Sequence, residues 1–365
     1  YQARLSDTTT RCPSRPDFND ASFMIVLQIC LIMQPYCSCG NRDCVSRIAR
    51  MGRGIVKMRL AQFGALALSL LVSGSAFSQQ QRFNTIEAAK NGWFAEQSRS
   101  ATWYLSQHKR LTTAIATLQP QRPGVVDAYV LSIGLDSDPV FTRESAEAAN
   151  VLARRYGAAG RTLHFAAGAD DKAIGPAQGS PSNLAIGLAA IAAKMDPKED
   201  VLILFATTHG DPVSGLAYRD GEYAGGMIGP QRLANLIDGV GIKRRMVLLS
   251  ACFSGIFLPL LTNDQTVIVT AASSQRTSFG CAPGNDWTFF GDALVNNALR
   301  KPQTFDVAVG EATRLIYDWE GQLRLVPSRP QVFVGDNARV WLDALEDKMP
   351  KTPTAKVGRP AISSD

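Results

Sequence analysis

Histidine is scarce in this chain of 365 residues. There are only three, His108, His164 and His209, so a histidine-rich metal centre is implausible. Several motifs are absent as well: the H-E-x-x-H zinc motif, the G-x-G-x-x-G loop, the Walker loop and the G-x-S-x-G elbow. These absences argue against zinc-dependent hydrolysis, dinucleotide or nucleotide-phosphate binding, and elbow-type serine hydrolysis. We expect no metal and no cofactor.

Beyond residue 78 the chain has little cysteine and almost no net charge. Five of the seven cysteines lie in residues 1–78, which leaves Cys252 and Cys281 downstream. The same segment holds nine Lys/Arg against four acidic residues and so carries +5 of the formal net charge of +6. The main body is therefore neither a disulfide framework nor a basic nucleic-acid-binding surface, and no nucleic-acid partner is expected.

Residues 51–78 have the order of features of a secretory signal peptide. Arg53, Lys57 and Arg59 precede an apolar run of 13 residues, Leu60 to Val72, and small residues follow it. The run is shorter than the roughly 20 residues that cross a bilayer, so a permanent anchor is the weaker alternative. We expect an exported protein, periplasmic or secreted, with no stable membrane span after signal removal.

By its composition, the rest of the chain divides into four segments. Residues 1–50 show no clean periodicity, and we interpret them as an upstream extension outside the mature fold, with Met51 or Met58 as the start. Residues 79–123 are predicted to be an N-terminal helical segment, with helical spacing from about 84 to 118. The main domain is expected at 124–345. Residues 346–365, polar and containing three prolines, are predicted to be a flexible tail.

Apolar strands and helices alternate through the main domain. Strands are predicted at 127–133, 162–166, 200–206, 245–251 and 266–272, and helices at 143–156, 183–194, 230–238, 254–261, 287–299 and 304–319. Continuously apolar strands joined by helices indicate a sheet that is buried on both faces. We therefore predict an α/β fold in one domain, a three-layer α/β/α sandwich with a mostly parallel sheet.

Two reactive side chains follow neighbouring strands of this prediction. His209 and Gly210 come just past the strand VLILFAT, and Cys252 comes just past the strand RMVLLS. In such a sheet ligands bind beyond the carboxyl ends of the strands, and consecutive parallel strands often lie side by side. An imidazole can accept the thiol proton, and the N–H groups of Gly210 and Cys252 can bind an oxyanion. On spacing alone a buried structural cysteine and histidine remain the alternative.

At these residues the sequence resembles a family. Strand-His-Gly followed by strand-Ser-Ala-Cys-Phe-Ser-Gly is similar to the C13 peptidases, the legumain or asparaginyl endopeptidase group, which have a caspase-like fold. The similarity runs from about residue 127 to 333. It continues through four further motifs, Thr270-Ala271-Ala272, Thr277-Ser278-Phe279-Gly280-Cys281, Thr288-Phe289-Phe290-Gly291-Asp292 and Ser328-Arg329-Pro330-Gln331.

The resemblance implies a role for each matching residue. Cys252 would be the nucleophile, His209 the base and proton donor, and Gly210 part of the oxyanion hole together with Cys252. The primary specificity (S1) pocket would be formed by Arg143, Asp292, Ser278 and Ser250. An arginine and an aspartate together suit an asparagine side chain.

The chain departs from the family pattern at two positions. Ser250 stands where legumains have an acidic residue two before the cysteine, and Phe141 stands where they have an asparagine. Loss of the carboxylate weakens strict selectivity for Asn and admits Asp.

The resulting hypothesis is an exported cysteine endopeptidase that cleaves after Asn or Asp through a Cys252 thioester, with a peptide or protein as substrate. Two alternatives stay open: a transpeptidase or ligase that uses the same thioester, and a non-catalytic binding protein. Nothing in the sequence indicates the oligomeric state, the natural substrate or a need for proteolytic activation.

Overall fold

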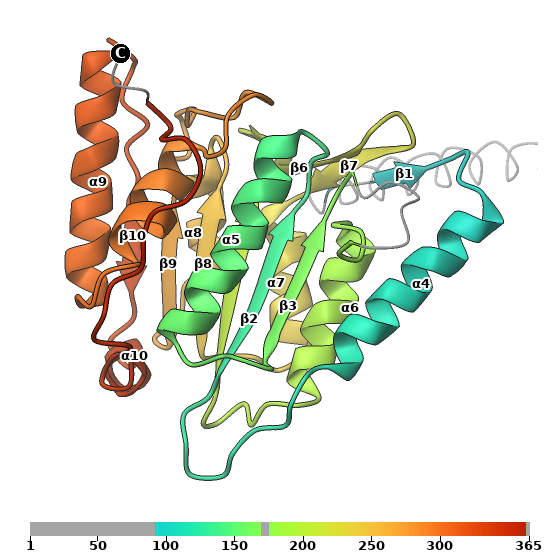
Figure 1. The fold of residues 1–365 in the computed structure, drawn as a ribbon, viewed down its shortest axis with the longest axis horizontal. Coiled ribbons are helices and arrows are strands. Elements are labelled where there is room, and N and C mark those ends of the chain that lie inside the picture. Colours follow the sequence, from blue (N-terminus) through green and yellow to red (C-terminus); the bar gives the residue numbers. More distant parts are fainter. Residues whose placement is uncertain (1–91, 93, 169–174, 363–365) are drawn as a thin grey trace, which may run out of the picture. The chain divides into compact units, whose positions relative to one another are not determined.

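The structure is a computed structural model that describes residues 92, 94–168 and 175–362 (Figure 1). The predicted extension (1–50) and signal peptide (51–78) lie outside the described residues. Within the described chain, a central sheet has the strand order β10-β9-β8-β4-β2-β3. All neighbouring pairs are parallel except β9 and β10. The bounds are Ala128–Gly134 (β2), Thr162–Ala166 (β3), Val201–Thr207 (β4), Arg245–Ser250 (β8), Thr266–Thr270 (β9) and Gln331–Val334 (β10).

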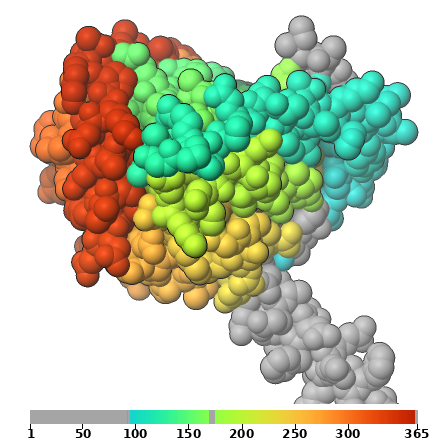
Figure 2. Space-filling model, turned by 90° about the horizontal axis from the view of Figure 1, so that it is seen from below, coloured from blue at the N-terminus to red at the C-terminus, as the bar shows by residue number. Residues whose placement is uncertain are grey.

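Helices cover both faces of this sheet. One face packs against α5 (Pro139–Arg155), η2 (Gly291–Ala298), α9 (Phe305–Gln322) and α10 (Ala338–Glu346). The other packs against α4 (Ala101–Ala116), α6 (Pro181–Ala192), α7 (Pro230–Gly239) and α8 (Leu258–Leu261), with a short 3-10 turn, η1 (Ser254–Phe257), before α8. Figure 2 shows α4 (cyan) beside the yellow-green residues of α6, and the C-terminal residues (red) at the opposite edge.

Side chains alternate between the two cores along each strand. In β2, Val130 belongs to the α5 side and Leu131 to the α6 side; in β4, Ile203 and Leu204 divide in the same way. All four are fully buried, as period-2 alternation between two apolar layers requires. The predicted three-layer sandwich with a mostly parallel sheet is confirmed.

A second, antiparallel sheet has the order β1-β7-β6-β5. Its strands are Phe94–Glu96 (β1), Gly210–Asp211 (β5), Gly215–Asp220 (β6) and Ala224–Ile228 (β7). The sequence analysis predicted no strand between the strand at 200–206 and the helix at 230–238, where β5, β6 and β7 lie. Their sequences are short and contain Gly225 and Gly226, so they lack the alternation that predicts a strand.

The N-terminal helix is shorter than predicted. Residues 94–96 form β1, and the helix begins only at Ala101, where the hydroxyl of Ser100 accepts a hydrogen bond from Trp103 N at 3.1 Å. An N-cap of this kind fixes a helix start. Arg99, immediately before it, lies between the rings of Trp103 and Tyr223. This tertiary packing overrides the helical spacing upstream of Ser100.

The C-terminal segment is not the loose tail that the sequence predicted. After α10, residues 352–361 are hydrogen-bonded to the body at several points, among them Thr354 N to Arg300 O at 3.2 Å and Ala361 N to Asp292 Oδ2 at 2.7 Å. Figure 1 shows this segment (dark red) rising from α10 toward the end at which the arrows of the parallel strands point. We call residues 352–361 the C-terminal strap.

Candidate active site

The two reactive side chains leave adjacent strands at the same end of the sheet. β4 and β8 are neighbours, with Thr207 opposite Ser250, and Thr208 N donates to Ser250 O at 3.1 Å. His209 and Cys252 follow these strand ends. The adjacency predicted from the order of the strands is therefore confirmed.

The Cys252 thiol is half-buried and forms no disulfide. Ser278 N donates to its Sγ at 3.3 Å, and the Ser278 hydroxyl lies 3.7 Å from the same sulfur. The thiol in turn lies 3.5 Å from Ser278 O, to which it can donate. Phe253, the next residue, has a φ of 55°, in the left-handed region that non-glycine residues rarely adopt. The chain thus turns sharply at Cys252, and Phe253 N donates to Arg276 O at 2.8 Å.

Gly210 is in close contact with Cys252. A Cβ at position 210 would lie 1.9 Å from the carbonyl oxygen of Cys252, so no other residue fits without moving the backbone. The space beside this glycine is thus occupied by the backbone of Cys252. Its part in an oxyanion hole stays a prediction.

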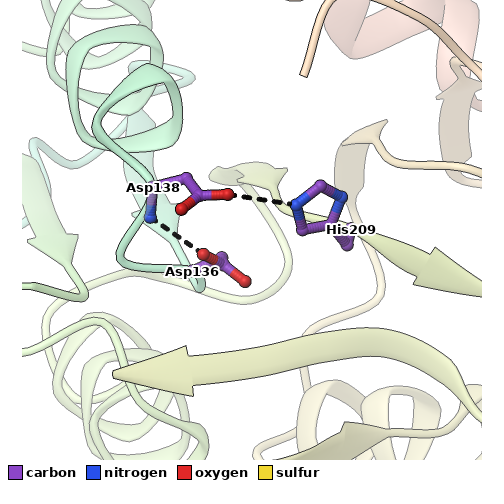
Figure 3. A group of neighbouring side chains, drawn as sticks. All are labelled: Asp136, Asp138 and His209. Carbon is purple, nitrogen blue, oxygen red and sulfur yellow. Dashed lines mark hydrogen bonds and ion pairs between the residues drawn. The ribbon is translucent and has the colours of Figure 1, made fainter. Parts of the chain in front are cut away.

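His209 is held from two sides. Its Nε2 lies 3.4 Å from Asp138 Oδ2 (Figure 3), and the ring of Phe141 packs edge-on against it with centroids 5.0 Å apart. The His209 side chain is 39% exposed, so the ring is accessible while its orientation is fixed. Among the described residues, no hydrogen bond joins His209 to Cys252. Phe141, which replaces the asparagine of the family pattern, thus packs against the imidazole.

Asp138 is a functional candidate that the sequence analysis missed. It precedes α5, directly beyond β2, the third strand that ends at this edge. Burial raises the pKa of its carboxyl, but hydrogen bonds from Arg219 and His209 outweigh burial and lower the pKa below its ordinary value. The carboxylate is therefore ionised at neutral pH. An acid beyond a strand end was the available signal, but Asp-Pro at a helix start reads as an ordinary N-cap.

Asp136, Asp138 and His209 each bring one ligand atom within 4.8 Å of the others, a spacing that suits a cation. Arg219 already occupies both carboxylates: its Nη2 lies 2.7 Å from Asp136 Oδ1 and 2.5 Å from Asp138 Oδ1. Positive charge is thus supplied by the protein itself. We assign this cluster to the orientation of His209 and not to a metal.

Arg143 lies on α5 at the rim of the site. Its Nε is 3.2 Å from Asp286 Oδ1, and its Nη2 donates to Pro283 O at 3.0 Å and also to Asn285 O. The side chain is 40% exposed. Among the described residues Nη1 has no hydrogen-bond partner, so one end of the guanidinium faces outward from these contacts and is available to a ligand.

Ser250 and Asp292 are buried, so the pocket role predicted for them is not supported. Ser250 Oγ pairs with Thr288 Oγ1 at 3.0 Å. Asp292 accepts from the side chains of Asn296 and Asn297 at 2.8 and 3.1 Å and, through Oδ2, from the backbone of Ala361. Both acceptor oxygens of Asp292 are thus occupied, one of them by the C-terminal strap.

Glu144 was also missed by the sequence analysis. It is fully buried beneath the strand ends, where its Oε1 accepts from Thr207 Oγ1 at 2.8 Å and its Oε2 from Thr288 N at 2.7 Å. Burial raises the pKa of this carboxyl. Glu144 therefore braces the ends of β4 and β8 from below. It follows Arg143 in the sequence, and an acid inside an amphipathic helix gave no sign of its burial.

The predicted residues fall into two groups. The first, Cys252, Gly210 and Ser278, is joined by direct contacts, with His209 beside it on the neighbouring strand end. Arg143 is linked to this group through one loop, residues 276–287, whose two ends touch Cys252 and Arg143. The second group, Ser250 and Asp292, lies in the interior.

Comparison with known proteins agrees with the strand-end chemistry. Residues 182–315 match the sequence profile of the Peptidase C13 family. The matched segment contains His209 and Cys252, whereas Arg143 precedes it. A similar solved structure is caspase-1 from Spodoptera frugiperda, with 13% identity over 58% of this chain and 89% of that chain and a TM-score of 0.39. No curated protein sequence matches the chain. The family match confirms the resemblance found in the sequence over the segment that carries His209 and Cys252, and it supports a cysteine peptidase in general.

Proposed function

We propose that the protein is an endopeptidase that cleaves after Asn or Asp through a thioester on Cys252. The observation that carries this proposal is the pairing at adjacent strand ends: a thiol that accepts an N–H from Ser278, and an imidazole oriented by Asp138. A purely structural cysteine and histidine would not need an ionised carboxylate and a half-exposed ring at this edge.

In the proposed mechanism, the Cys252 sulfur attacks the carbonyl carbon of the scissile bond, and His209 takes the thiol proton. Since Nε2 lies beside Asp138, Nδ1 is the ring nitrogen left for this proton. His209 then gives the proton to the departing amine as the carbon–nitrogen bond breaks, which leaves the thioester. His209 next takes a proton from water, whose oxygen attacks the thioester, and the thiol and the carboxylic acid are restored. The N–H groups of Gly210 and Cys252 are proposed to bind the oxyanion.

Arg143 is proposed to bind the side chain that precedes the cleaved bond. A guanidinium N–H can donate to the carbonyl oxygen of Asn and, more strongly, to the carboxylate of Asp. Because Ser250 is buried and paired with Thr288, and Asp292 is buried with partners on both oxygens, neither offers an acceptor for the amide nitrogen of Asn. We therefore propose that both residues are accepted and that Asn is not strictly required.

The site of action is proposed to be outside the cytoplasm, on the strength of the leader pattern in residues 51–78. Within the part of the chain that the structure describes, no helix is long and apolar enough to cross a bilayer. The partner of a peptidase is a protein or peptide substrate.

The test uses residues 79–365 and fluorogenic peptides that end in Asn, Asp or Gln before the reporter. We expect cleavage of the Asn and Asp peptides and at least a 1,000-fold loss in Cys252→Ala, because without the nucleophile no thioester forms. Cys281→Ala, a matched loss of the other free thiol of the described chain, should change the rate less than threefold. Equal activity of wild type and Cys252→Ala would remove the assignment. Products with an added amine, analysed by mass spectrometry, separate hydrolysis from ligation.

A further inference from the structure

We propose that a cavity between α4, α6 and the small sheet binds a small, uncharged amide with an apolar body. The cavity has a volume of about 230 Å³. In Figure 1, α4 and α6 lie side by side, and β1 leads into α4. Neither His209 nor Cys252 lines the cavity, so this inference does not depend on the proposed function. The residues that carry it are Glu96, Trp103, Tyr104, Gln107, Asn183 and Ile186.

Two buried donors on one face of α4 lack a partner. Trp103 is 5% exposed and Gln107, one helical turn later, is 6% exposed. Within the described part of the chain, Trp103 Nε1 and Gln107 Nε2 form no hydrogen bond. Gln107 Oε1 accepts from Gln178 N at 3.0 Å, and since a backbone N–H only donates, Nε2 is the free end of this amide. Buried donors without a partner are costly, which favours a ligand that brings an acceptor.

The first turn of α6 adds a third donor and an acceptor to the cavity wall. The hydroxyl of Ser180 caps the helix by accepting Asn183 N at 3.2 Å. The N–H of Ser182, in the same turn, has no partner inside the helix. Asn183 Nδ2 donates to Gln178 O at 2.8 Å, which leaves Asn183 Oδ1 as the acceptor. Ser182 and Asn183 both line the cavity. An amide group, with one carbonyl oxygen and an N–H, complements such a wall.

The charges beside the cavity select an uncharged ligand. Glu96 lines the cavity, and its Oε1 lies 3.5 Å from Arg99 Nε. Arg99 Nη2 also lies 2.5 Å from Asp220 Oδ2. Two carboxylates with one guanidinium leave a net charge of −1, which disfavours a second carboxylate. A cation is disfavoured as well, because Arg99 already covers the ring of Trp103 at 4.2 Å from its centroid.

The rim and the size of the cavity define the rest of the ligand. Tyr104 and Ile186 line the cavity and are large apolar side chains that are exposed. The rings of Trp103 and Tyr104 meet edge-on with centroids 5.2 Å apart. The volume is far above the roughly 30 Å³ that one water occupies and below the roughly 300 Å³ of the smallest drug-sized pockets. The ligand is therefore about as large as one aromatic ring with a short chain.

The experiment compares three probes that differ at one end: 3-phenylpropionamide, 3-phenylpropionate and 3-phenylpropylamine. Their binding to residues 79–365 is measured by saturation-transfer NMR. We expect the amide to bind with a Kd of about 1 mM, and the carboxylate and the amine at least about fivefold more weakly. Equal binding of all three probes, or tightest binding of the amine or the carboxylate, would overturn the inference.

Two variants remove one donor each. Trp103→Phe keeps an aromatic ring and loses the indole N–H. Gln107→Glu keeps the oxygen that Gln178 N requires and loses the free N–H. Each should weaken binding of 3-phenylpropionamide about fivefold. Gln322→Glu, at the exposed end of α9, is the matched control and should leave the Kd unchanged. Unchanged binding in both Trp103→Phe and Gln107→Glu would contradict the assignment of the donors.

Two measurements on the wild-type protein do not depend on how these variants fold. Amide hydrogen exchange should slow at residues 103–111 and 182–186 when 3-phenylpropionamide is added. Alkylation of Cys252 with iodoacetamide should leave its Kd unchanged, because the thiol does not line the cavity. Slower exchange elsewhere only, loss of binding on alkylation, or no binding at all, with the cavity holding water alone, would show that the inference is wrong. None of these readouts involves turnover, so failure of the proposed peptidase activity is a separate result.

Discussion

At the scale of single residues, the site depends on how His209 is oriented. Asp138 and Phe141 define the plane and the direction of its ring, and Arg219 keeps Asp138 ionised. A carboxylate that holds an imidazole selects the tautomer in which the other nitrogen can accept a proton.

Asp138→Asn should lower kcat roughly 100-fold, because an amide favours the wrong tautomer and does not stabilise the imidazolium. The Asp138 side chain makes no capping bond to α5, so the helix should be unaffected. The measurement is kcat on the Asn peptide beside the melting temperature. An unchanged kcat would show that Asp138 does not orient His209.

A second residue-scale prediction concerns Glu144, which accepts from Thr207 and Thr288 in a site with no exposure. Glu144→Ala should lower the free energy of unfolding by about 3 kcal/mol, since it leaves a cavity and two unpaired donors. Glu144→Gln keeps both bonds by donating to the Thr207 hydroxyl and should cost far less.

The pH dependence of the free energy of unfolding tests whether the protonated or the ionised form of Glu144 stabilises the fold. Burial raises the pKa of Glu144 in the folded state. The contribution of Glu144 to the free energy of unfolding is therefore complete below the unfolded pKa, near 4.5, and is lost as pH rises. Denaturation by urea between pH 4 and pH 8 should therefore show that the free energy of unfolding of Glu144→Gln rises relative to that of wild type as pH increases. If Glu144→Gln instead loses stability relative to wild type as pH increases, the carboxylate form is the stabilising one.

At the scale of secondary-structure elements, β3 and α5 meet at a half-buried histidine, His164. His164 Nε2 lies 3.0 Å from Ser145 Oγ, and burial lowers the pKa of His164 to about 4. The unfolded chain binds this proton near pH 6.5, so the free energy of unfolding should fall as pH drops from about 6.5 to about 4, by at most about 1.4 kcal/mol per pH unit.

His164→Gln should flatten this part of the stability profile, measured by urea denaturation at pH 7.5 and pH 5. His108→Gln, at an exposed position on α4, is the matched control and should keep the wild-type slope. The same slope in both variants would show that His164 does not carry the effect.

The elements also show which features the sequence could predict. The apolar runs of β4 and β8 predicted buried parallel strands, and their ends predicted the positions of His209 and Cys252 correctly. The strands of the small sheet have no comparable pattern, because glycine and half-buried residues make up much of β7. Asp138 resembled an N-cap, and only its tertiary contact with His209 distinguishes it.

Long-range contacts explain the features that the sequence did not predict. Asp292 was expected in a pocket, but it binds Ala361, which is 69 residues away in the sequence. The strap is polar and contains proline, a composition that predicts a loose end, and its order depends on side chains of a helix and a loop that the sequence places far away. Composition predicts the local conformational tendency of a segment, but it does not predict which distant residues that segment contacts.

At the scale of the whole molecule, the leader pattern makes a prediction about the mature chain. When the full sequence is expressed in a bacterium with a periplasm, we expect the exported form to begin near Gln79, because the small residues before it are typical of a cleavage site. Intact mass of the periplasmic protein measures this directly. A protein that keeps residues 51–78 and stays in the cytoplasm would contradict export.

The central claim is that the Cys252 thiol and the Arg143 pocket act on one substrate, and a peptide library tests both at once. Residues 79–365 are incubated with peptides that vary at the position before the cleaved bond, and products are identified by mass spectrometry. The account predicts cleavage after Asn and Asp, absent in Cys252→Ala and reduced for both residues in Arg143→Ala. Cleavage after other residues with no preference for Asn or Asp, or cleavage that survives Cys252→Ala, would contradict it.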